Sequence, residues 1–297
     1  MSISALSAGT ANVTRPSDVV LAWRTLRAPQ WIHFAALPAL PLYASFRTAP
    51  LEALARFVPG AAVASLALAF AYGINAIADR HGDHDLAKNP LAGLAQAPPL
   101  AWAAAIGCAV LALTMAALGA PWLRLDCTLL SLVAGTLYSA GPRWKSIPVV
   151  GTLTNAVIFA PLALVVRNDG AATSHVTLLL GAFVVLQTQA QLVHEAGDLA
   201  EDESAGISSS AVMFGPRAAM TAARVLGWIA AVAFVACFGP SWMPGIASAA
   251  ALLGGALIGR ASPEQAGVIR LSHRRLSLVA GAVLFALAAS NPGAPTP

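Results

Sequence analysis

The sequence predicts an all-α polytopic membrane protein, and three observations support that prediction. Hydrophobic residues make up 58% of the 297 residues, charged residues only 10%, and the mean hydropathy is +0.72. Soluble domains are nearer half apolar and a quarter charged. The apolar residues form long continuous runs, and the basic residues are divided unevenly between the loops that join them. Continuous runs indicate helices, because the strands of a membrane barrel would alternate polar and apolar residues.

Nine apolar segments could each cross a bilayer, several of them with the help of flanking residues, since a crossing takes about 20 residues. They are 31–44, 61–78, 100–118, 127–140, 147–166, 177–193, 218–238, 242–258 and 276–289. We therefore expect about nine transmembrane helices in one domain, residues 19–290. Residues 1–18 are expected to be flexible and the Pro-rich tail 291–297 disordered.

The basic residues test the topology, because loops rich in Lys and Arg stay in the cytoplasm. If the N-terminus and the loops after even-numbered segments share one side, only Arg47, Arg56, Arg124 and Arg167 of 17 basic residues lie opposite. We therefore expect a multi-pass protein of the cytoplasmic membrane, with its active site on the cytoplasmic side, where most acids also lie. The modest net charge of +4 and the lack of a basic run do not indicate nucleic acid as a partner, and the apolar composition makes membrane lipids the expected surroundings.

Polar residues gather where the second apolar segment ends. Asn75, Asp79 and Asp83 are four residues apart, so on a helix they would line one face. Asp198 and Asp202 repeat the spacing after the sixth segment. A carboxylate near the hydrocarbon boundary is costly and by default marks a functional site. Solvated helix ends are the plainer interpretation, but two such clusters on one side disfavour it.

The chemistry of these side chains favours a metal-bridged diphosphate. Mg²⁺ prefers hard oxygen ligands, keeps several waters and shares its shell with substrate phosphates. The predicted metal ligands are Asn75, Asp79, Asp83, Asp198 and Asp202. The basic side chains on the same side would bind the diphosphate oxygens, and the strongest candidates are Lys88, Arg143 and Lys145.

A polar stripe enters the sixth segment just before its acids. His194 and Glu195 precede Asp198 by about one helical turn, and Gln191 lies one turn further back. His194 and Gln191 could face the cavity and hydrogen-bond an acceptor, with His194 orienting or deprotonating it. Simple polarity at a helix end is the alternative for His194 and Glu195, and the sequence leaves it open.

Four motifs, in order along the chain, resemble those of the UbiA superfamily of intramembrane prenyltransferases. The first is Asn75-x-x-x-Asp79-x-x-x-Asp83 followed by Lys88-Asn89-Pro90-Leu91 and Gly93; here Ala76 stands where the family often has Asp. The second is Asp198-x-x-x-Asp202-x-x-x-Gly206-Ile207, running on to Phe214-Gly215. The connecting loop is Tyr138-Ser139, Pro142-Arg143-Trp144-Lys145, Gly151 and Asn155, and Arg27 ahead of Trp31 fits the start of the first helix.

The resemblance implies a helical bundle around a central cavity that opens to the cytoplasm. Mg²⁺ ions held by the two motifs would bind an isoprenyl diphosphate donor, whose tail lies in an apolar tunnel, and a small lipophilic acceptor would take the isoprenyl group. The implied catalytic residues are Asp79, Asp198, Arg143 and Lys145, and the polar stripe adds His194 to them. The implied substrate-binding residues are Arg27, Asn75, Lys88, Tyr138, Arg143 and Lys145, and the polar stripe adds Gln191 to them.

Three alternatives stay open beside this hypothesis. A UbiA-like enzyme could act on a non-aromatic acceptor or as a cyclase. A transporter could use intramembrane acids to couple ions, although its acids would be expected near the middle of spans. A phosphatidyl-type alcohol transferase also uses clustered aspartates, but neither cluster supplies the Asp-Gly and Ala-Arg elements of its motif.

Overall fold

A computed structural model describes residues 16–167, 173–238, 265, 272 and 275. In this part of the chain the only β pairing is an isolated bridge between Leu123 and Val166, so the all-α prediction is confirmed there. The α-helices are α1 (Asp18–Thr25), α2 (Ala28–Trp31), α3 (Tyr43–Thr48), α4 (Pro50–Asp79), α5 (Pro99–Leu118), α6 (Leu125–Ser139), α7 (Val150–Ala163), α8 (Thr173–Gly197), α9 (Leu199–Ser204), α10 (Ser210–Phe214) and α11 (Pro216–Phe238). Two 3₁₀ helices are η1 (Ile32–Ala39) and η2 (Trp144–Ser146).

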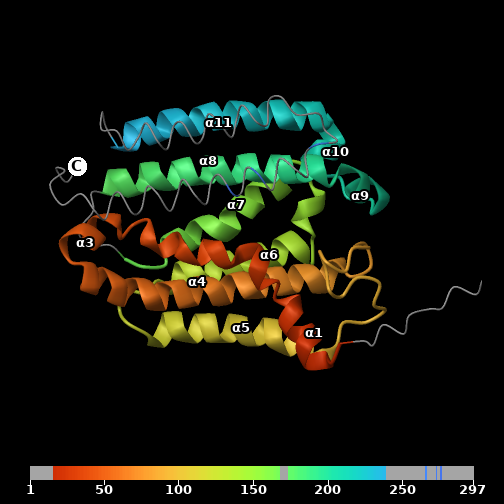
Figure 1. Ribbon diagram of the computed structural model, residues 1–297, viewed down its shortest axis with the longest axis horizontal. Helices are drawn as coiled ribbons and strands as arrows, with labels where there is room; N and C mark the ends of the chain where they lie inside the picture. Colours follow the sequence, from red (N-terminus) through yellow and green to blue (C-terminus); the bar gives the residue numbers. More distant parts are fainter. Residues whose placement is uncertain (1–15, 168–172, 239–264, 266–271, 273–274, 276–297) are drawn as a thin grey trace, which may run out of the picture.

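The long helices lie side by side in two groups (Figure 1). Helix α4 packs against α5 and α6, and α8 packs against α11. Helix α7 contacts both α6 and α8 and so joins the two groups. Helices α9 and α10 lie at the same end of the bundle as the loop that follows α4 (Figure 1). Segments far apart in the sequence therefore meet at that end.

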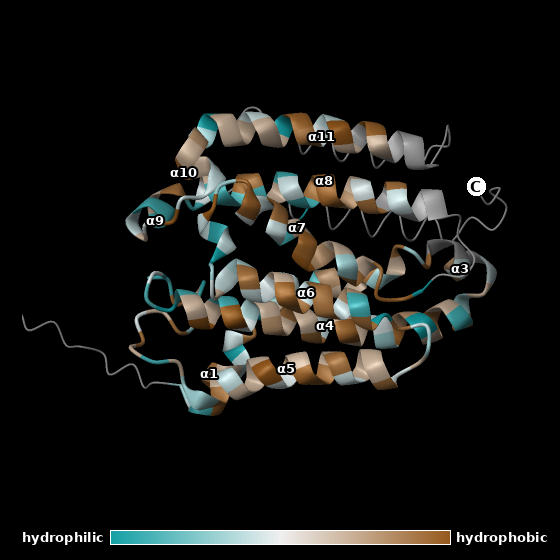
Figure 2. Ribbon diagram, turned by 180° about the vertical axis from the view of Figure 1, so that it is seen from behind, coloured by the Kyte–Doolittle hydropathy of each residue, from teal (hydrophilic) through white to brown (hydrophobic). Residues whose placement is uncertain are grey.

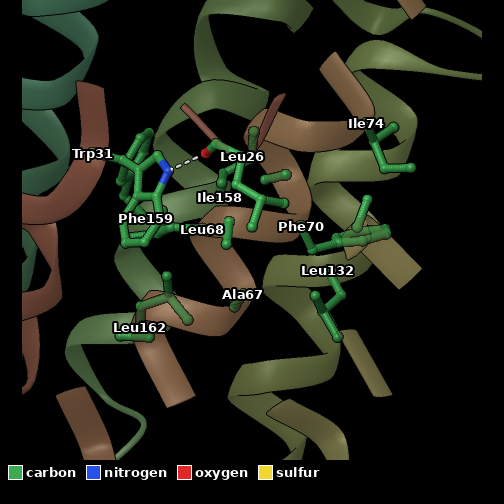
Figure 3. Packing of buried hydrophobic residues seen from close by; sticks show 14 of the residues in the cluster. Leu26, Trp31, Ala67, Leu68, Phe70, Ile74, Leu132, Ile158, Phe159 and Leu162 are labelled. Atoms are coloured by element: carbon green, nitrogen blue, oxygen red, sulfur yellow. Dashed lines mark hydrogen bonds between the residues drawn. The ribbon is translucent and has the colours of Figure 1, made fainter. Parts of the chain in front are cut away.

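The main core lies between α4, α5, α6 and α7 and includes Leu68, Leu132 and Leu162 (Figure 3). Lipid tails are as apolar as these side chains, so packing of helices in a bilayer depends on close van der Waals contact and small residues. At Gly135 of α6, a Cβ atom would lie 2.9 Å from the Cβ of Ala71 on α4. A glycine is needed there because the two backbones approach so closely.

The outer faces of the helices are apolar. Figure 2 shows hydrophobic colour along the middle of the long helices and hydrophilic colour on α9 and the neighbouring loops. Among the described residues, α4, with 30 residues, and α5, with 20, are long and apolar enough to span a membrane, and α6 and α7 are shorter apolar helices. The expected spans 242–258 and 276–289, and residues 1–15 and 291–297, lie outside the described residues.

The first expected span, 31–44, is not one helix. The chain there forms the end of α2, then η1, then the start of α3. Pro38 lies inside η1, and Pro41 follows it. A proline has no N–H to donate and its ring clashes with the preceding helical turn, so two prolines three residues apart break an α-helix. Hydropathy alone predicted a continuous span because it does not register this effect.

Candidate functional site

A cavity of about 610 Å³ opens at the end of the bundle where α4, α6 and α8 terminate. Its lining includes all the side chains for which the sequence predicted a role. These are Arg27, Asn75, Asp79, Asp83, Lys88, Tyr138, Arg143, Lys145, Gln191, His194, Asp198 and Asp202. Residues up to 175 positions apart in the chain thus share one chamber, with apolar wall residues such as Phe159 beside them.

The first acidic cluster lies partly on α4 and partly beyond it. Asn75 and Asp79 occupy the last two turns of the helix, which ends at Asp79. Asp83 lies in the following turn, where its N–H donates to the Asp79 carbonyl over 2.9 Å. The expectation that all three residues line one helix face is therefore wrong for Asp83. The Arg80 guanidinium donates to the Ile77 carbonyl over 2.8 Å, which satisfies one acceptor that the helix end leaves open.

Asn89 fixes the loop that carries Asp83. Its side chain is fully buried, and Nδ2 donates to the Ala76 carbonyl over 2.9 Å and to Asp83 Oδ2 over 2.8 Å. Its Oδ1 accepts the N–H of Leu91 over 3.0 Å. One amide therefore joins the end of α4, the Asp83 carboxylate and the chain beyond it. The Lys88-Asn89-Pro90-Leu91 motif has this structural role in addition to the charge of its lysine.

Asp79 accepts contacts from two other elements. Its Oδ1 lies 3.2 Å from Arg143 Nη2 and forms an ion pair with Lys145, both from the loop between α6 and α7. Its Oδ2 accepts from Asn75 Nδ2 over 2.8 Å. Asn75 Oδ1 in turn accepts from Arg27 Nη1 over 3.0 Å. These contacts hold the Asp79 carboxylate, whose side chain is only 10% exposed, in one orientation.

The second cluster lies at a break between helices. Helix α8 ends at Gly197, and Asp198 is the N-cap residue of the short helix α9, which carries Asp202. Asp198 Oδ2 lies 3.0 Å from Lys88 Nζ and 3.1 Å from His194 Nδ1. Lys88 also pairs with Glu201. The lysine of the first motif thus bridges to the second cluster.

Burial and neighbouring charges shift three pKa values in these loops. Burial raises the pKa of Asp202 to about 6, with a further contribution from Asp198, although the nearby Ser209 hydroxyl opposes it. Burial likewise raises the pKa of Asp83, against the hydrogen bond from Asn89. Burial disfavours the charged form of Lys88, but Asp198 and Glu201 outweigh it and raise the pKa of the ammonium. Acids crowded in this way favour a bound cation.

The UbiA prenyltransferase family model matches residues 32–275. The chain belongs to this family. UbiA proteins are integral membrane proteins. The chain is 28% identical over 187 residues to lycopene elongase/hydratase from Corynebacterium glutamicum, and the match covers 59% of this chain and 64% of the relative.

Solved structures of UbiA proteins share the fold. The chain resembles a UbiA homolog from Archaeoglobus fulgidus bound to DMAPP and Mg²⁺, with a TM-score of 0.69 and 23% identity over 91% of this chain and 99% of the other. It also resembles the same organism's UbiA homolog bound to GPP and Mg²⁺, with a TM-score of 0.67, 22% identity and the same coverage. At this level of identity the likeness establishes the fold alone.

The oxygen donors of this UbiA protein suit Mg²⁺, although they do not form a ready-made cage. Within the described part of the chain, no group of three Asp, Glu, His or Cys side chains is placed to hold a metal ion. The acids of the two clusters lie on separate elements and are paired with Lys88, Arg143 and Lys145. Mg²⁺ usually takes only one or two protein carboxylates and completes its shell with water and substrate phosphates. The carboxylate and amide oxygens that line the cavity fit that requirement.

Sequence reasoning missed several polar residues of the site. Glu201 and Gln30 line the cavity, and Gln30 Nε2 donates to the Lys88 carbonyl over 3.3 Å. Glu195, left open above, is buried and accepts from Thr152. For Glu201, the signal was its place between Asp198 and Asp202. Gln30 and Thr152 gave none, since neither is charged or spaced with the acidic clusters.

Proposed function

We propose that this UbiA protein is a Mg²⁺-dependent integral-membrane prenyltransferase. It transfers an isoprenyl group from an allylic diphosphate to an aromatic or other lipophilic acceptor. The observation that supports this most strongly is the composition of the single cavity described above. Two carboxylate clusters, the cations Lys88, Arg143 and Lys145, and apolar residues such as Phe159 line the same space. That combination suits a molecule with a diphosphate head and a hydrocarbon tail.

In this proposal four acids and one amide hold the metal. The ligands are Asn75, Asp79, Asp83, Asp198 and Asp202. When bound, Mg²⁺ would neutralise the diphosphate oxygens and stabilise the charge that grows on them as the allylic C–O bond ionises. Asp79 and Asp198 are the principal ligands, because each already attracts cationic side chains into the cavity.

The basic residues bind the diphosphate directly. Arg143 and Lys145 are paired with Asp79, and Lys88 with Asp198, so a bound cation would free these side chains for the phosphate oxygens. Charge-assisted contacts of this kind stabilise the leaving diphosphate as it takes both electrons of the C–O bond. Arg27, through Asn75, and Tyr138 complete the polar wall of the donor site.

The apolar wall protects the carbon that the diphosphate leaves. Ala71, Ile158 and Phe159 line the cavity beside the polar groups. An allylic cation reacts with water, so the pocket has to keep water away until the acceptor reaches it. The acceptor then forms the new C–C bond and loses a proton. His194 and Gln191, which also line the cavity, are the proposed acceptor-side residues.

The acceptor class has two candidates. The similarity to lycopene elongase/hydratase favours a non-aromatic polyene, whereas family membership alone is equally compatible with an aromatic ring. The match to that relative covers 64% of its length. A transporter is less well supported, because the acids lie at helix ends and not within spans. We assign the site to the cytoplasmic side of the cytoplasmic membrane from the distribution of basic residues.

A direct assay tests this function. Membranes containing the protein would be incubated with labelled allylic diphosphates of several chain lengths and with aromatic and polyene acceptors, with Mg²⁺ or with EDTA. We expect a labelled lipophilic product that forms only with Mg²⁺, and the productive acceptor decides between the two classes. Failure of every pair to give product, together with no Mg²⁺-dependent release of diphosphate, would contradict the proposal.

A further inference from the structure

The loop that carries Arg143 and Lys145 contains a strained residue. Val149 has φ 64° and ψ −46°, a region that β-branched residues rarely adopt. The N–H of Val150 donates to the Pro148 carbonyl over 2.7 Å, which closes a γ-turn around Val149. Such a conformation persists only where surrounding contacts enforce it. The contacts that enforce it here lead to residues to which no role has yet been assigned.

A buried chain of hydrogen bonds starts at the strained residue. The N–H of Val149 donates to Ser210 Oγ over 2.9 Å. Ser210 Oγ lies 2.8 Å from Thr152 Oγ1, and Thr152 Oγ1 donates to Glu195 Oε1 over 2.8 Å. Thr152, Ser210 and Glu195 are at most 6% exposed. This row of hydrogen bonds therefore joins the α6–α7 loop to α7, α10 and α8.

The direction of the chain follows from the donors available. A carboxylate has no proton to give, so Thr152 uses its single hydroxyl proton on Glu195. Ser210 must then donate to Thr152 while accepting from Val149. Every bond points towards Glu195, and hydrogen bonds aligned in this way strengthen one another.

Glu195 receives further donors from its own surroundings. Its Oε2 accepts the backbone N–H of Ser210 over 2.9 Å, and Oε1 also accepts from Gln191 Nε2 over 3.2 Å. The same Gln191 nitrogen donates to the Tyr138 hydroxyl over 3.2 Å. Both carboxylate oxygens are thus engaged by the protein. This arrangement suits a fixed anchor better than a metal ligand or a base.

The loop also rests directly on the start of α7. A Cβ atom at Gly151 would lie 2.8 Å from the Cα of Lys145 and 2.9 Å from the carbonyl oxygens of Lys145 and Trp144. A shift of α7 or of the γ-turn would therefore move the backbone of Lys145. Lys145 is 11% exposed in its side chain and pairs with Asp79 across the cavity rim.

We infer that Glu195, Thr152 and Ser210 form a brace that positions Arg143 and Lys145 for the diphosphate of the donor. The three are positioning residues: Glu195 lines the cavity, but both of its carboxylate oxygens accept hydrogen bonds from the protein. The inference rests on the proposed function, because it assumes that the loop binds a diphosphate. If these residues only stabilised the fold, their loss would lower the stability of the protein but leave its affinity for the donor unchanged.

The test compares three threonine variants. Thr152→Val removes the hydroxyl at nearly constant volume, and Thr152→Ser keeps it. Thr154→Val is the matched control: Thr154 lies on the same helix, is 5% exposed, and its hydroxyl donates only to the Val150 carbonyl over 2.7 Å. Ser210→Ala removes the acceptor of the Val149 N–H by a different route and serves if Thr152→Val does not fold.

Two quantities would be measured: the affinity for inorganic diphosphate with Mg²⁺, by calorimetry, and the KM for donor and acceptor. We expect Thr152→Val and Ser210→Ala to weaken diphosphate binding and raise the donor KM about fivefold to tenfold, with the acceptor KM unchanged. Thr152→Ser and Thr154→Val should stay within about twofold of wild type.

Two results would overturn the brace. One is a Thr152→Val protein that melts earlier but binds diphosphate as wild type does. The other is an equal loss in Thr152→Val and Thr154→Val. Wild-type protein that binds neither diphosphate nor an allylic diphosphate would instead overturn the proposed function itself, and the brace with it. The two failures are distinguishable because the second appears before any substitution is made.

Discussion

The two acidic clusters have the same four-residue spacing, yet the chain supports them differently. Asp79 is the last residue of a continuous helix of 30 residues. Arg143 from the α6–α7 loop and Asn75 from α4 contact it directly, and Arg27 from the α1–α2 connection acts through Asn75. Asp198 occupies the N-cap position of a short helix after a break, and its partners include Lys88 and the neighbouring His194. The side chain of Asp79 is 10% exposed and that of Asp198 is 20% exposed.

This difference in support indicates that the two clusters have different roles when substrate binds. The first cluster is held rigidly, which suits a group that has to meet the diphosphate with little reorganisation. The second cluster lies on the short helix α9 and is joined to the loop of the first cluster by Lys88. A bound metal ion could replace the ion pairs of Lys88 with Asp198 and Glu201. We therefore expect the first cluster to be the preformed half of the site and the second to adjust on binding.

The largest effect is expected when either cluster loses its principal acid. Asp79→Ala or Asp198→Ala should lower turnover on the order of a thousandfold or more, since the lost metal would otherwise stabilise the growing charge by several kcal/mol. Both proteins should remain folded, because each change lies at a helix end and removes no core volume. Turnover is measured with the labelled donor, and folding by thermal denaturation.

The two alanine variants should also differ in stability. Asp79→Ala leaves Arg143 and Lys145 without their carboxylate, whereas after Asp198→Ala Lys88 still has Glu201. Asp79→Ala should therefore be the less stable protein. Product formation within a few-fold of wild type in either variant would rule out the metal assignment.

Neutralising the diphosphate-binding side chains should have the next largest effect. Lys145→Gln or Arg143→Gln should weaken donor binding by about 10-fold to 150-fold, because a hydrogen bond to a charged group contributes about 1.5–3 kcal/mol. Lys145 should give the larger loss, since its side chain is 11% exposed and that of Arg143 is 45% exposed. Donor and acceptor KM values are measured separately. A change confined to the acceptor KM would require a different role for the loop.

Asn89 tests whether the first cluster is indeed the more rigid one. Asn89→Ala leaves the Ala76 carbonyl and Asp83 without their donor and should cost about 1–3 kcal/mol of stability. Ser209→Ala removes a buried hydroxyl near Asp202 that has no hydrogen-bond partner among the described residues, and should cost less. Leu86→Ala, a change at a side chain that is 67% exposed in the same loop as Asn89, should stay within about 0.5 kcal/mol. Equal losses at Asn89 and Ser209 would refute the difference in rigidity.

The sequence predicted the helical fold and the acids that line the cavity because hydropathy and four-residue spacing are local signals, whereas Arg27 and Tyr138 were expected only from the resemblance to the family. It did not predict where helices stop. Asp83 was expected on the same helix face as Asn75 and Asp79 and lies beyond the end of α4, since helix ends depend on contacts such as that of Arg80 with the Ile77 carbonyl. The brace of Thr152, Ser210 and Glu195 was also out of reach. Its members are 15 to 58 residues apart, and only packing of α7, α8 and α10 brings them together.

The smallest effect is expected at His194, and it concerns the more adjustable cluster. His194 Nδ1 lies 3.1 Å from Asp198 Oδ2, on the cavity side of α8. We expect His194→Ala to slow transfer about fivefold, in line with the loss of one hydrogen bond of about 1 kcal/mol that orients the acceptor. Lys88 still pairs with Asp198 in that variant, so affinity for Mg²⁺ and for the donor diphosphate should change by less than about twofold. Without acceptor, slow hydrolysis of the allylic diphosphate should persist. If donor binding were lost outright, His194 would have to be assigned to holding Asp198 for the metal, and the acceptor side of the cavity would rest on Gln191 alone.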